Sequence, residues 1–316
     1  MKRWWTSLFF LLLILAMLPA LVVIGAALFL ARMMIRPRRL PLRHTPRDVG
    51  LDYEAVHFDS DDGLYLDGWF IPAPGDGPRP AVVIAHGWPW NRAGTPAQDF
   101  FARLTQSPPI DLLRPAQALH QAGFHVLMFD FRNHGLSGSA PYLTFGRDEA
   151  ADLMGAVRYL RRRPDVDPAR VGVLGFSMGG NAVVFACARD DEQAIRAAVA
   201  VQPVRPSVFA PRFAATLLGP LAEPTLRLAL RLYHRAGGPL LEEVDPTLVG
   251  DLVSTPIFYL QGNGDPWGTV RDVRRLYEQA TGPKQIKIVP TQDRYGGYLY
   301  LGDHPEEMVA FFQKHL

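Results

Sequence analysis

The chain has 316 residues and a formal net charge of +2, with 48% hydrophobic and 20% charged residues. These proportions are ordinary for a globular protein with a substantial core. The positive charge is concentrated at one end, since residues 1–50 carry +7 and the remainder carries −5. An acidic body argues against a nucleic-acid-binding surface. Cys187 is the only cysteine, so no disulfide can form within the chain.

The N-terminal segment predicts a membrane anchor. Leu8 to Leu30 is a run of 23 residues without a charge. As a helix rising ~1.5 Å per residue, it is long enough to cross a hydrocarbon layer of ~30 Å. Trp4 and Trp5 precede the run, where indole rings favour the headgroup region. A cleaved signal peptide is the alternative, but its apolar run is only about 7–15 residues long. We therefore expect a retained anchor over residues 1–34, with residues 8–30 in the membrane.

A basic, proline-containing linker is expected over residues 35–50. The prolines disfavour helix at the residues before them, which keeps the segment extended. Arginines that follow a span stay in the cytoplasm, so the part of the chain after the linker is predicted to be cytoplasmic. These arginines can also lie on anionic lipid headgroups. The five arginines closest after the span are Arg32, Arg36, Arg38, Arg39 and Arg43.

The sequence after residue 50 predicts a single α/β domain over residues 51–316. Two strand-like segments flank a predicted hairpin turn at Asp61–Gly63. Short apolar runs then alternate with amphipathic helical patterns, and continuous apolar runs are typical of strands buried on both faces of a parallel sheet. We therefore expect a mostly parallel sheet with helices on both faces. The apolar runs lie at residues 81–87, 125–132, 170–177, 195–204, 256–265 and 285–290.

Residues 205–250 interrupt this alternation and are expected to form a helical cap insertion. In "TLRLALRLYHRAGG", Arg227, Arg231 and Arg235 recur every four residues, opposite leucines. This spacing is typical of a solvated helix face. It is also typical of a basic amphipathic helix at a membrane surface.

The stretch "GFSMGG" points to a nucleophile at Ser177. It directly follows an apolar run and precedes a helical pattern, and G-x-S-x-G in a strand–turn–helix context places the serine hydroxyl on a sharp, exposed turn. The N-terminus of the following helix directs free N–H groups toward an incoming anion. An ordinary serine in a glycine-rich turn is the alternative.

This motif makes the chain resemble the α/β-hydrolase superfamily, in particular its serine-aminopeptidase and dienelactone-hydrolase branch. "HGW" at 86–88 and "DFRNHGLS" at 130–137 carry the resemblance further, and it extends from residue 54 to the C-terminus. It implies an α/β-hydrolase fold with Ser177 as nucleophile. It also implies an oxyanion hole formed by the backbone N–H groups of Trp88 and Met178.

The acid and the base follow the serine in the chain order of this family. By position Asp265 is the acid, which would orient an imidazole, although it could instead cap the next helix. The family pattern "P-x-x-x-H-x-G-G-Y" would place the histidine at position 294, where this chain has Arg294. Arginine cannot accept a proton at neutral pH.

A relocated base is therefore expected, and only two histidines follow Asp265. His304 opens the last helical pattern, and a loop over residues 291–303 would be long enough to bring it over the serine. His315 is next to last and is a poor candidate. An incomplete triad remains an alternative, and so does recruitment of His86 or His134, which otherwise have structural roles.

These features predict a membrane-anchored serine hydrolase that acts on an ester, thioester or amide through an acyl-enzyme on Ser177. Its partners would be the membrane and a small-molecule or lipid-like acyl substrate. The alternative is a non-catalytic α/β-hydrolase-like protein that binds a ligand or partner. A peptidase would need acidic residues to capture an amine, such as Glu242, Glu243 and Asp245. No metal-ligand spacing, phosphate loop or dinucleotide motif occurs in the sequence, so no cofactor or metal is expected.

Overall fold

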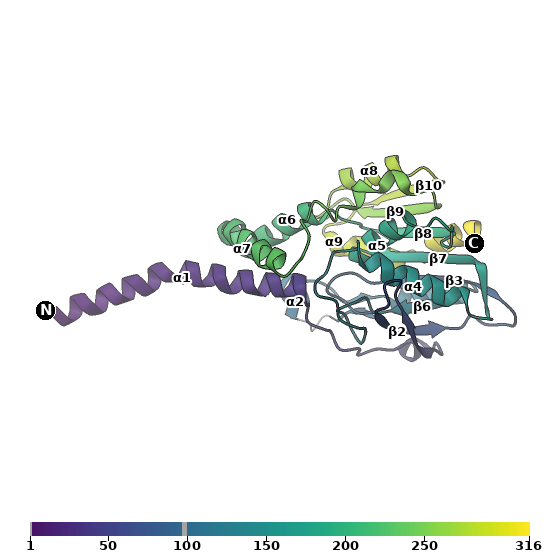
Figure 1. The fold of residues 1–316 in the computed structure, drawn as a ribbon, viewed down its shortest axis with the longest axis horizontal. Coiled ribbons are helices and arrows are strands. Elements are labelled where there is room, and N and C mark those ends of the chain that lie inside the picture. The colour runs from purple at the N-terminus through teal and green to yellow at the C-terminus, as the bar shows by residue number, and fades with distance from the viewer. Residues whose placement is uncertain (1, 97–99) are drawn as a thin grey trace.

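The computed structural model describes the backbone of residues 2–96 and 100–316, and the side chains of residues 17–96 and 102–316. An eight-stranded sheet forms its centre, in the order β1-β2-β6-β3-β7-β8-β9-β10 (Figure 1). A small second sheet pairs β4 (Gly94–Thr95) with β5 (Ile110–Asp111). The strands of the large sheet are β1 (Glu54–Asp59), β2 (Tyr65–Ile71), β3 (Arg79–Ala85), β6 (His125–Phe129), β7 (Val166–Phe176), β8 (Ala197–Val201), β9 (Ile257–Gly262) and β10 (Lys284–Val289).

The strand directions confirm the mostly parallel sheet. The predicted hairpin is present, since β1 and β2 pair antiparallel around Asp61–Gly63, and β2 also runs antiparallel to β6. The pairs from β6 through β3, β7, β8 and β9 to β10 are all parallel. Ala85 lies opposite both Phe129 and Gly175, so three central strands end at the same level. Residues that follow these strands therefore meet at one edge of the sheet.

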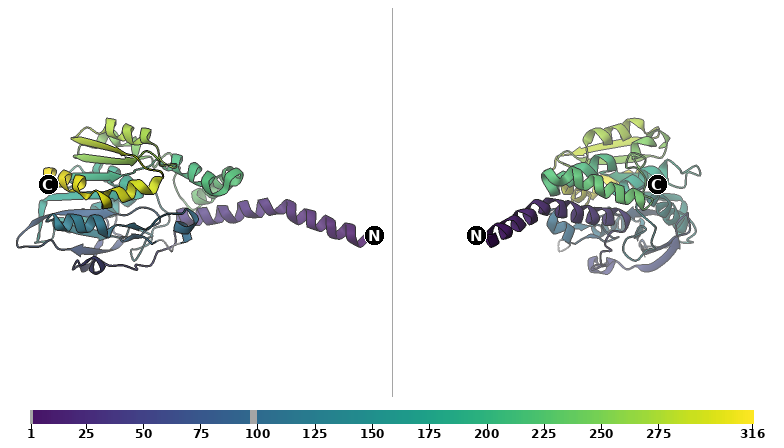
Figure 2. Two further views of the ribbon diagram at one scale, coloured as in Figure 1. Left: turned by 180° about the vertical axis from the view of Figure 1, so that it is seen from behind. Right: turned by 60° about the vertical axis from the view of Figure 1, so that its left-hand side comes forward.

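Helices cover both faces of the sheet, as the continuous apolar runs predict. Side chains alternate along β3, so that Val83 packs into one core and Val82 into the other. Helices α4, α5 and α8 complete the first core, and α3, α9 and α10 complete the second (Figure 2). The helices are α1 (Lys2–Ile35), α2 (Phe100–Leu104), α3 (Leu113–Gln121), α4 (Glu149–Arg161), α5 (Met178–Cys187), α6 (Pro206–Leu218), α7 (Ala222–Arg235), α8 (Val270–Gln279), α9 (Arg294–Asp303) and α10 (Pro305–His315).

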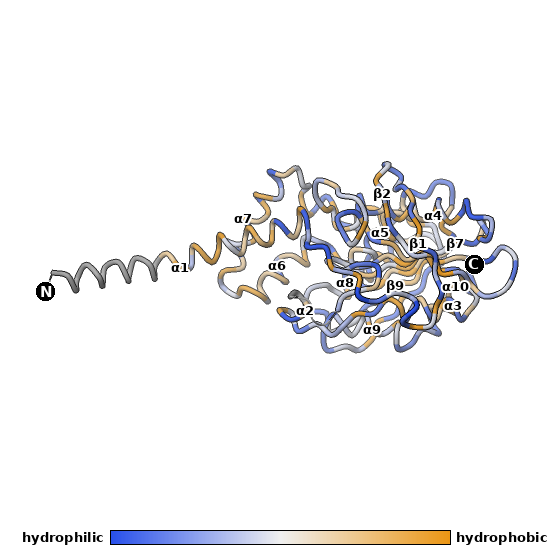
Figure 3. The backbone as a smooth tube through the Cα atoms, turned by 90° about the horizontal axis from the view of Figure 1, so that it is seen from below, coloured by the Kyte–Doolittle hydropathy of each residue, from blue (hydrophilic) through white to orange (hydrophobic). Residues whose placement is uncertain are grey.

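Helix α1 projects from the body and is long and apolar enough to cross a membrane. Within the residues whose side chains are described, the candidate span is Met17–Ile35, with a mean hydropathy of 2.2. By length and composition a signal sequence passes the same test. The side chains of Trp4 and Trp5 lie outside the described residues, so the expected aromatic belt stays a prediction. In Figure 3 the end of α1 that joins the body is strongly hydrophobic and lies beside α6 and α7.

The segment 291–303 was expected to be a loop, and this expectation is wrong. Residues Arg294–Asp303 form helix α9, which Asp293 caps by accepting a hydrogen bond from the Gly296 N–H at 2.9 Å. The loop was inferred so that His304 could reach the serine, and the adjacent glycines, which weaken a helical pattern, gave no sign of a helix. Here Gly297 is needed because a Cβ would lie 2.4 Å from the Gln202 side chain. The close approach of α9 to the sheet therefore explains the glycine.

The linker between α1 and the sheet is held against the body. The Arg39 guanidinium donates to the carbonyl oxygens of His134 at 3.0 Å and Gly135 at 2.9 Å, and to the Ser139 hydroxyl at 2.9 Å. It donates to the Ser137 carbonyl as well. This arginine binds a turn of the protein rather than a lipid headgroup, and it ties the end of α1 to the turn at residues 130–137.

We expect Arg39→Ala to lower the midpoint of thermal unfolding by about 2–4 °C, the shift that a loss near 1 kcal/mol gives in a domain of this size. The reason is that several backbone carbonyls lose a charged donor at once. Differential scanning fluorimetry of the purified full chain measures this shift. Arg38→Ala, at the neighbouring exposed position, is the control. Equal midpoints for the two variants would contradict the proposed role of Arg39.

Candidate active site

Ser177 occupies a sharp turn between a strand and a helix. Strand β7 ends at Phe176 and helix α5 begins at Met178, so Ser177 alone makes the turn, with φ 53° and ψ −112°. A Cβ on Gly175 would lie 2.1 Å from the Gly179 carbonyl oxygen, and one on Gly179 would lie 2.3 Å from that of Ala85. Only glycines fit at these two positions, which gives the G-x-S-x-G pattern its physical reason. A strained turn of this kind is typical of a nucleophile elbow.

Asp265 lies just beyond the end of β9, in the position expected of the acid. One carboxylate oxygen accepts from the N–H groups of Trp267 and Gly268, both at 2.9 Å. The other accepts from the Gln261 amide at 3.2 Å. Its side chain is 1% exposed. These bonds fix the carboxylate in one orientation, and its second oxygen faces the interior of the site.

Arg294 lies between Asp265 and Ser177. It is the first residue of α9, its side chain is 2% exposed, and one terminal nitrogen forms an ion pair with Asp265. The other terminal nitrogen donates to Ser177 Oγ at 3.1 Å and to the Gln202 carbonyl at 2.9 Å. Nε donates to the hydroxyl of Tyr298, one helical turn later. The arginine thus contacts both the acid and the nucleophile, as the histidine of a triad would.

Neither Arg294 nor Tyr298 can serve as a proton acceptor near neutral pH. Burial disfavours the charge on the guanidinium, but the charge of Asp265 and the contact with Tyr298 outweigh it and raise the pKa of Arg294 above its ordinary value. Burial raises the pKa of Tyr298 to about 12, so its hydroxyl stays protonated. The described part of the chain therefore places a serine and a carboxylate in the expected positions of nucleophile and acid, but no proton acceptor next to Ser177.

The structure does not bring His304 to Ser177. This residue lies at the junction of α9 and α10, its side chain is 53% exposed, and Nδ1 is 3.5 Å from the Glu306 carboxylate. Its ring packs against Tyr300 with 4.7 Å between centroids. Because residues 294–303 are helical, no long loop is present to swing it over the serine. His315, on the last helix, packs against Phe311 instead.

His86 and His134 are buried beside the elbow, and both have structural partners. His86 donates from Nδ1 to the Gly87 carbonyl at 2.8 Å and accepts at Nε2 from the Phe131 N–H at 3.1 Å. His134 donates to the Arg132 carbonyl at 2.8 Å. Burial lowers the pKa of His86 to about 4 and that of His134 to about 3. Both rings are neutral at pH 7 and support the turn.

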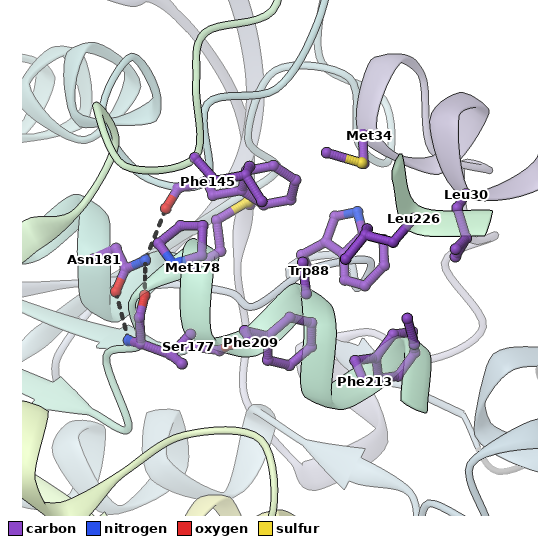
Figure 4. A pocket seen from close by; sticks show the side chains of 15 residues that line it. Leu30, Met34, Trp88, Phe145, Ser177, Met178, Asn181, Phe209, Phe213 and Leu226 are labelled. Atoms are coloured by element: carbon purple, nitrogen blue, oxygen red, sulfur yellow. Dashed lines mark hydrogen bonds between the residues drawn. The ribbon is translucent and has the colours of Figure 1, made fainter. Parts of the chain in front are cut away.

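An apolar cavity lies on one side of Ser177, with a volume of about 680 Å³ that includes its opening to solvent. Trp88 and Met178, the two residues expected to form the oxyanion hole, line this cavity together with the serine (Figure 4). Asn181 holds the surrounding loops by donating to the carbonyls of Phe145 at 2.9 Å and Val204 at 2.8 Å. A second, more polar cavity contains Ser177 and Arg294.

Two of the three acidic residues considered for capturing a substrate amine have other contacts. Asp245 forms an ion pair with Arg205 at 2.5 Å and caps the next turn through the Thr247 N–H. Glu243 accepts from the Leu240 N–H at 3.0 Å. The described residues that line the two cavities at Ser177 do not include them. The structure thus gives Glu243 and Asp245 local structural roles, and Glu242 is exposed outside both cavities.

Sequence reasoning missed three parts of the site. The bridging position of Arg294 was not foreseen, although the mismatch with the family pattern had drawn attention to it. Tyr298 could have been found from its spacing of four residues from Arg294, which places both on one helix face. The contribution of α1 to the cavity, through Leu30 and Met34, has no signal in the local sequence.

The buried histidines should make the fold sensitive to acid. The pKa of each ring is 6.5 in the unfolded chain but about 4 (His86) or about 3 (His134) in the folded protein. Between these values the unfolded state therefore binds more protons than the folded state. The free energy of unfolding should therefore fall as the pH decreases from about 6.5 toward 4. Urea denaturation of wild type and His134→Leu measures this. The loss between pH 7 and pH 5 should be smaller in the variant by about 1–2 kcal/mol. Identical pH dependence would contradict the neutral, buried state of His134.

Comparison with known proteins places this geometry in a family. Residues 82–314 match the Alpha/beta hydrolase family. The uncharacterized protein YfhR of Escherichia coli K12 is 28% identical, over 82% of this chain and 80% of its own, and Rv2307c of Mycobacterium tuberculosis is 28% identical over 74% and 70%. The esterase Pf2001 of Pyrococcus furiosus has a TM-score of 0.64 at 25% identity, covering 90% of this chain and 97% of its own. The acylaminoacyl peptidase of Pyrococcus horikoshii shares the fold, with a TM-score of 0.60 at 17% identity over 84% of this chain and 42% of its own. The chain therefore belongs to the alpha/beta hydrolase family and is a hydrolase of that type.

Proposed function

We propose that this protein is a membrane-anchored serine hydrolase that acts on an acyl-type ester, thioester or amide through an acyl-enzyme on Ser177. The main support for the proposal is that Ser177 occupies a strained turn and lines an apolar cavity. Trp88 and Met178 border the same cavity, so an acyl group placed there would have its carbonyl next to the nucleophile. The similarity to an esterase of known structure supports an ester as substrate.

The chemistry begins with addition of Ser177 Oγ to the substrate carbonyl carbon. Negative charge then develops on the carbonyl oxygen, where the N–H of Met178 and that of Trp88 would stabilise it. Met178 is the first residue of α5, and the first N–H groups of a helix have no partner within it. Loss of one such donor typically slows a hydrolase by about 100- to 1000-fold. Departure of the leaving group gives the acyl-enzyme, which water then hydrolyses.

Arg294 changes the proton transfers in this scheme. Its guanidinium stabilises negative charge on Ser177 Oγ, because a fixed cation in a buried site favours the alkoxide. It cannot take up the serine proton or activate the attacking water, as an imidazole would. The proton therefore passes to water or to the leaving group, and both acylation and release of the acyl group are slow.

Packing at the end of α1 supports a retained anchor. The Trp88 indole donates to the Met33 carbonyl at 3.2 Å, and the Leu143 N–H donates to the Met34 carbonyl at 3.1 Å. These carbonyls belong to the last turn of the helix, where partners within the helix are missing. Removal of α1 by a signal peptidase would leave the hydrolase body without these contacts. A retained anchor, with arginines after it, favours a cytoplasmic body.

A second candidate function is ligand binding without catalysis. The observation that favours it is the buried ion pair of Arg294 and Asp265, which replaces the acid–histidine pair. In that case the cavity would hold an acyl group next to Ser177 and no bond would break.

Labelling by a fluorophosphonate probe distinguishes the two functions. We expect slow labelling of the wild type and none of Ser177→Ala, since the probe bonds to an activated serine hydroxyl. Arg294→His should accelerate labelling at least about tenfold, because a positioned general base contributes ~100- to 10,000-fold in natural enzymes. His304→Ala is the matched control and should leave the rate unchanged.

Each other pattern of labelling has a definite meaning. A wild type that stays unlabelled while Arg294→His becomes labelled would establish the non-catalytic function. Labelling that persists in Ser177→Ala would reject Ser177 as the nucleophile. A large loss in His304→Ala would restore that residue as the base.

A reporter fused after Leu316 tests the orientation in the membrane. We expect it to be active in the cytoplasm, because the arginines that follow the span are retained on that side. Replacing Arg36 and Arg38 by glutamine should weaken this preference. A fusion that is active only outside the cytoplasm would overturn the proposed orientation.

A further inference from the structure

The cavity at Ser177 has one wall that belongs to the anchor helix. Leu30 and Met34 of α1 line it together with Phe213 of α6 and Leu226 of α7. Figure 4 shows Ser177 on one side, the Trp88 indole in the middle, and Leu30 and Met34 on the far side, where α1 passes. The described lining contains no charged side chain. The cavity thus connects the nucleophile to the helix that is expected to enter the membrane.

The length of α1 places this wall near the membrane surface. The helix has 34 residues, which gives about 51 Å at ~1.5 Å per residue, whereas a hydrocarbon layer is only ~30 Å thick. Up to Leu28 the described part exposes large apolar side chains, with Leu21 58% and Leu28 55% exposed. From Ala27 onward the protein body covers one side of the helix, since Ala27 is 0% and Leu30 8% exposed, whereas Arg32 and Arg36 stay exposed on the other side. The side of α1 that packs on the body therefore includes Leu30 and Met34, the two residues that line the cavity.

Helix α7, which lies within the predicted cap at residues 205–250, packs along the same part of α1. Ala229 of α7 packs with Ala27 and Ala31, and Tyr233 packs with Met34, so α7 follows α1 in the same direction. The turn between α6 and α7 therefore extends toward the N-terminal end of α1, as Figures 1 and 2 show. An α1 that spans a bilayer would therefore hold α7 and the cavity wall at Leu30 and Met34 next to the membrane surface.

Exposed arginines surround this region. Arg227, Arg231 and Arg235 are exposed on α7, and Arg32 and Arg36 are exposed near the end of α1. Glu223 pairs with Arg227 and is the acidic residue of the first turn of α7. The leucines on the other side of α7 pack against α1, so the exposed arginines are the groups of α7 that can contact anionic headgroups. The charge pattern thus supports contact of the cap with a membrane surface.

We propose that the substrate is a bilayer lipid whose acyl chain passes from the adjacent leaflet between α1 and the cap helices into the cavity at Ser177. The uncharged lining suits a chain linked through an ester, thioester or amide rather than a free carboxylate. Cleavage of this lipid rests on the proposed function, but its entry does not require any chemistry at Ser177.

Photo-crosslinking of the full chain in nanodiscs tests this entry. The probe is a phosphatidylcholine with a diazirine near the end of one acyl chain, and the cross-linked peptides are identified by mass spectrometry. We expect cross-links on Trp88 and on residues 209–213, in wild type and in Ser177→Ala alike. Met34→Trp should reduce them at least about fivefold, because the larger side chain overfills the cavity. Leu28→Trp, at an exposed position of α1, should leave them unchanged.

Two results would overturn the proposal. Cross-links confined to exposed residues of α1 would place the lipid outside the cavity. Equal cross-linking from a diazirine acyl-coenzyme A in the aqueous phase would contradict entry from the bilayer. Leu226→Trp blocks the same cavity from α7 and replaces Met34→Trp if that variant does not fold. Failure of the hydrolase function is seen separately, as absent fluorophosphonate labelling with retained cross-links.

Discussion

The buried guanidinium of Arg294 joins a carboxylate, a serine hydroxyl and a backbone carbonyl, and the geometry of the whole site depends on it. It connects α9 to the ends of β9 and β7 through Asp265 and Ser177, and to Gln202 after β8. Removing one partner of a buried ion pair typically costs about 3–5 kcal/mol, because the other charge is left uncompensated. The arginine is therefore part of the structure of this edge of the sheet as well as of its chemistry. The same contact deprives Ser177 of a base.

The sheet explains why these groups meet at all. Parallel strands that end at one level bring the residues after β3, β7 and β9 together, and the strained turn at Ser177 directs its hydroxyl out of the sheet. In this respect the site is that of a hydrolase. The site differs from a Ser-His-Asp triad at position 294. The elbow at Ser177 is intact, but the guanidinium of Arg294 lies where the imidazole of a histidine would be. The proposed function, slow hydrolysis of an acyl substrate at an apolar cavity, is consistent with this combination.

Local patterns predicted most of the fold and part of the site. Continuous apolar runs identified the parallel strands because burial on both faces leaves no room for alternation. The glycines around Ser177 identified the elbow because their requirement is local and steric. The sequence also showed that position 294 lacks histidine. It could not show that α9 replaces the expected loop, since Gly297 is explained only by its contact with Gln202, far away in the chain. Nor could it show that Met34 borders the cavity, for the same reason.

The central claim is that Ser177 can be acylated while Arg294 is unable to promote release of the acyl group. Intact-mass spectrometry of the full chain, during reaction with a p-nitrophenyl ester, tests this most directly. The account predicts one acyl group per chain that persists on Ser177 in the wild type, and rapid loss of that adduct in Arg294→His. The account would be contradicted if the wild type accumulated no adduct and released many equivalents of product as fast as Arg294→His does.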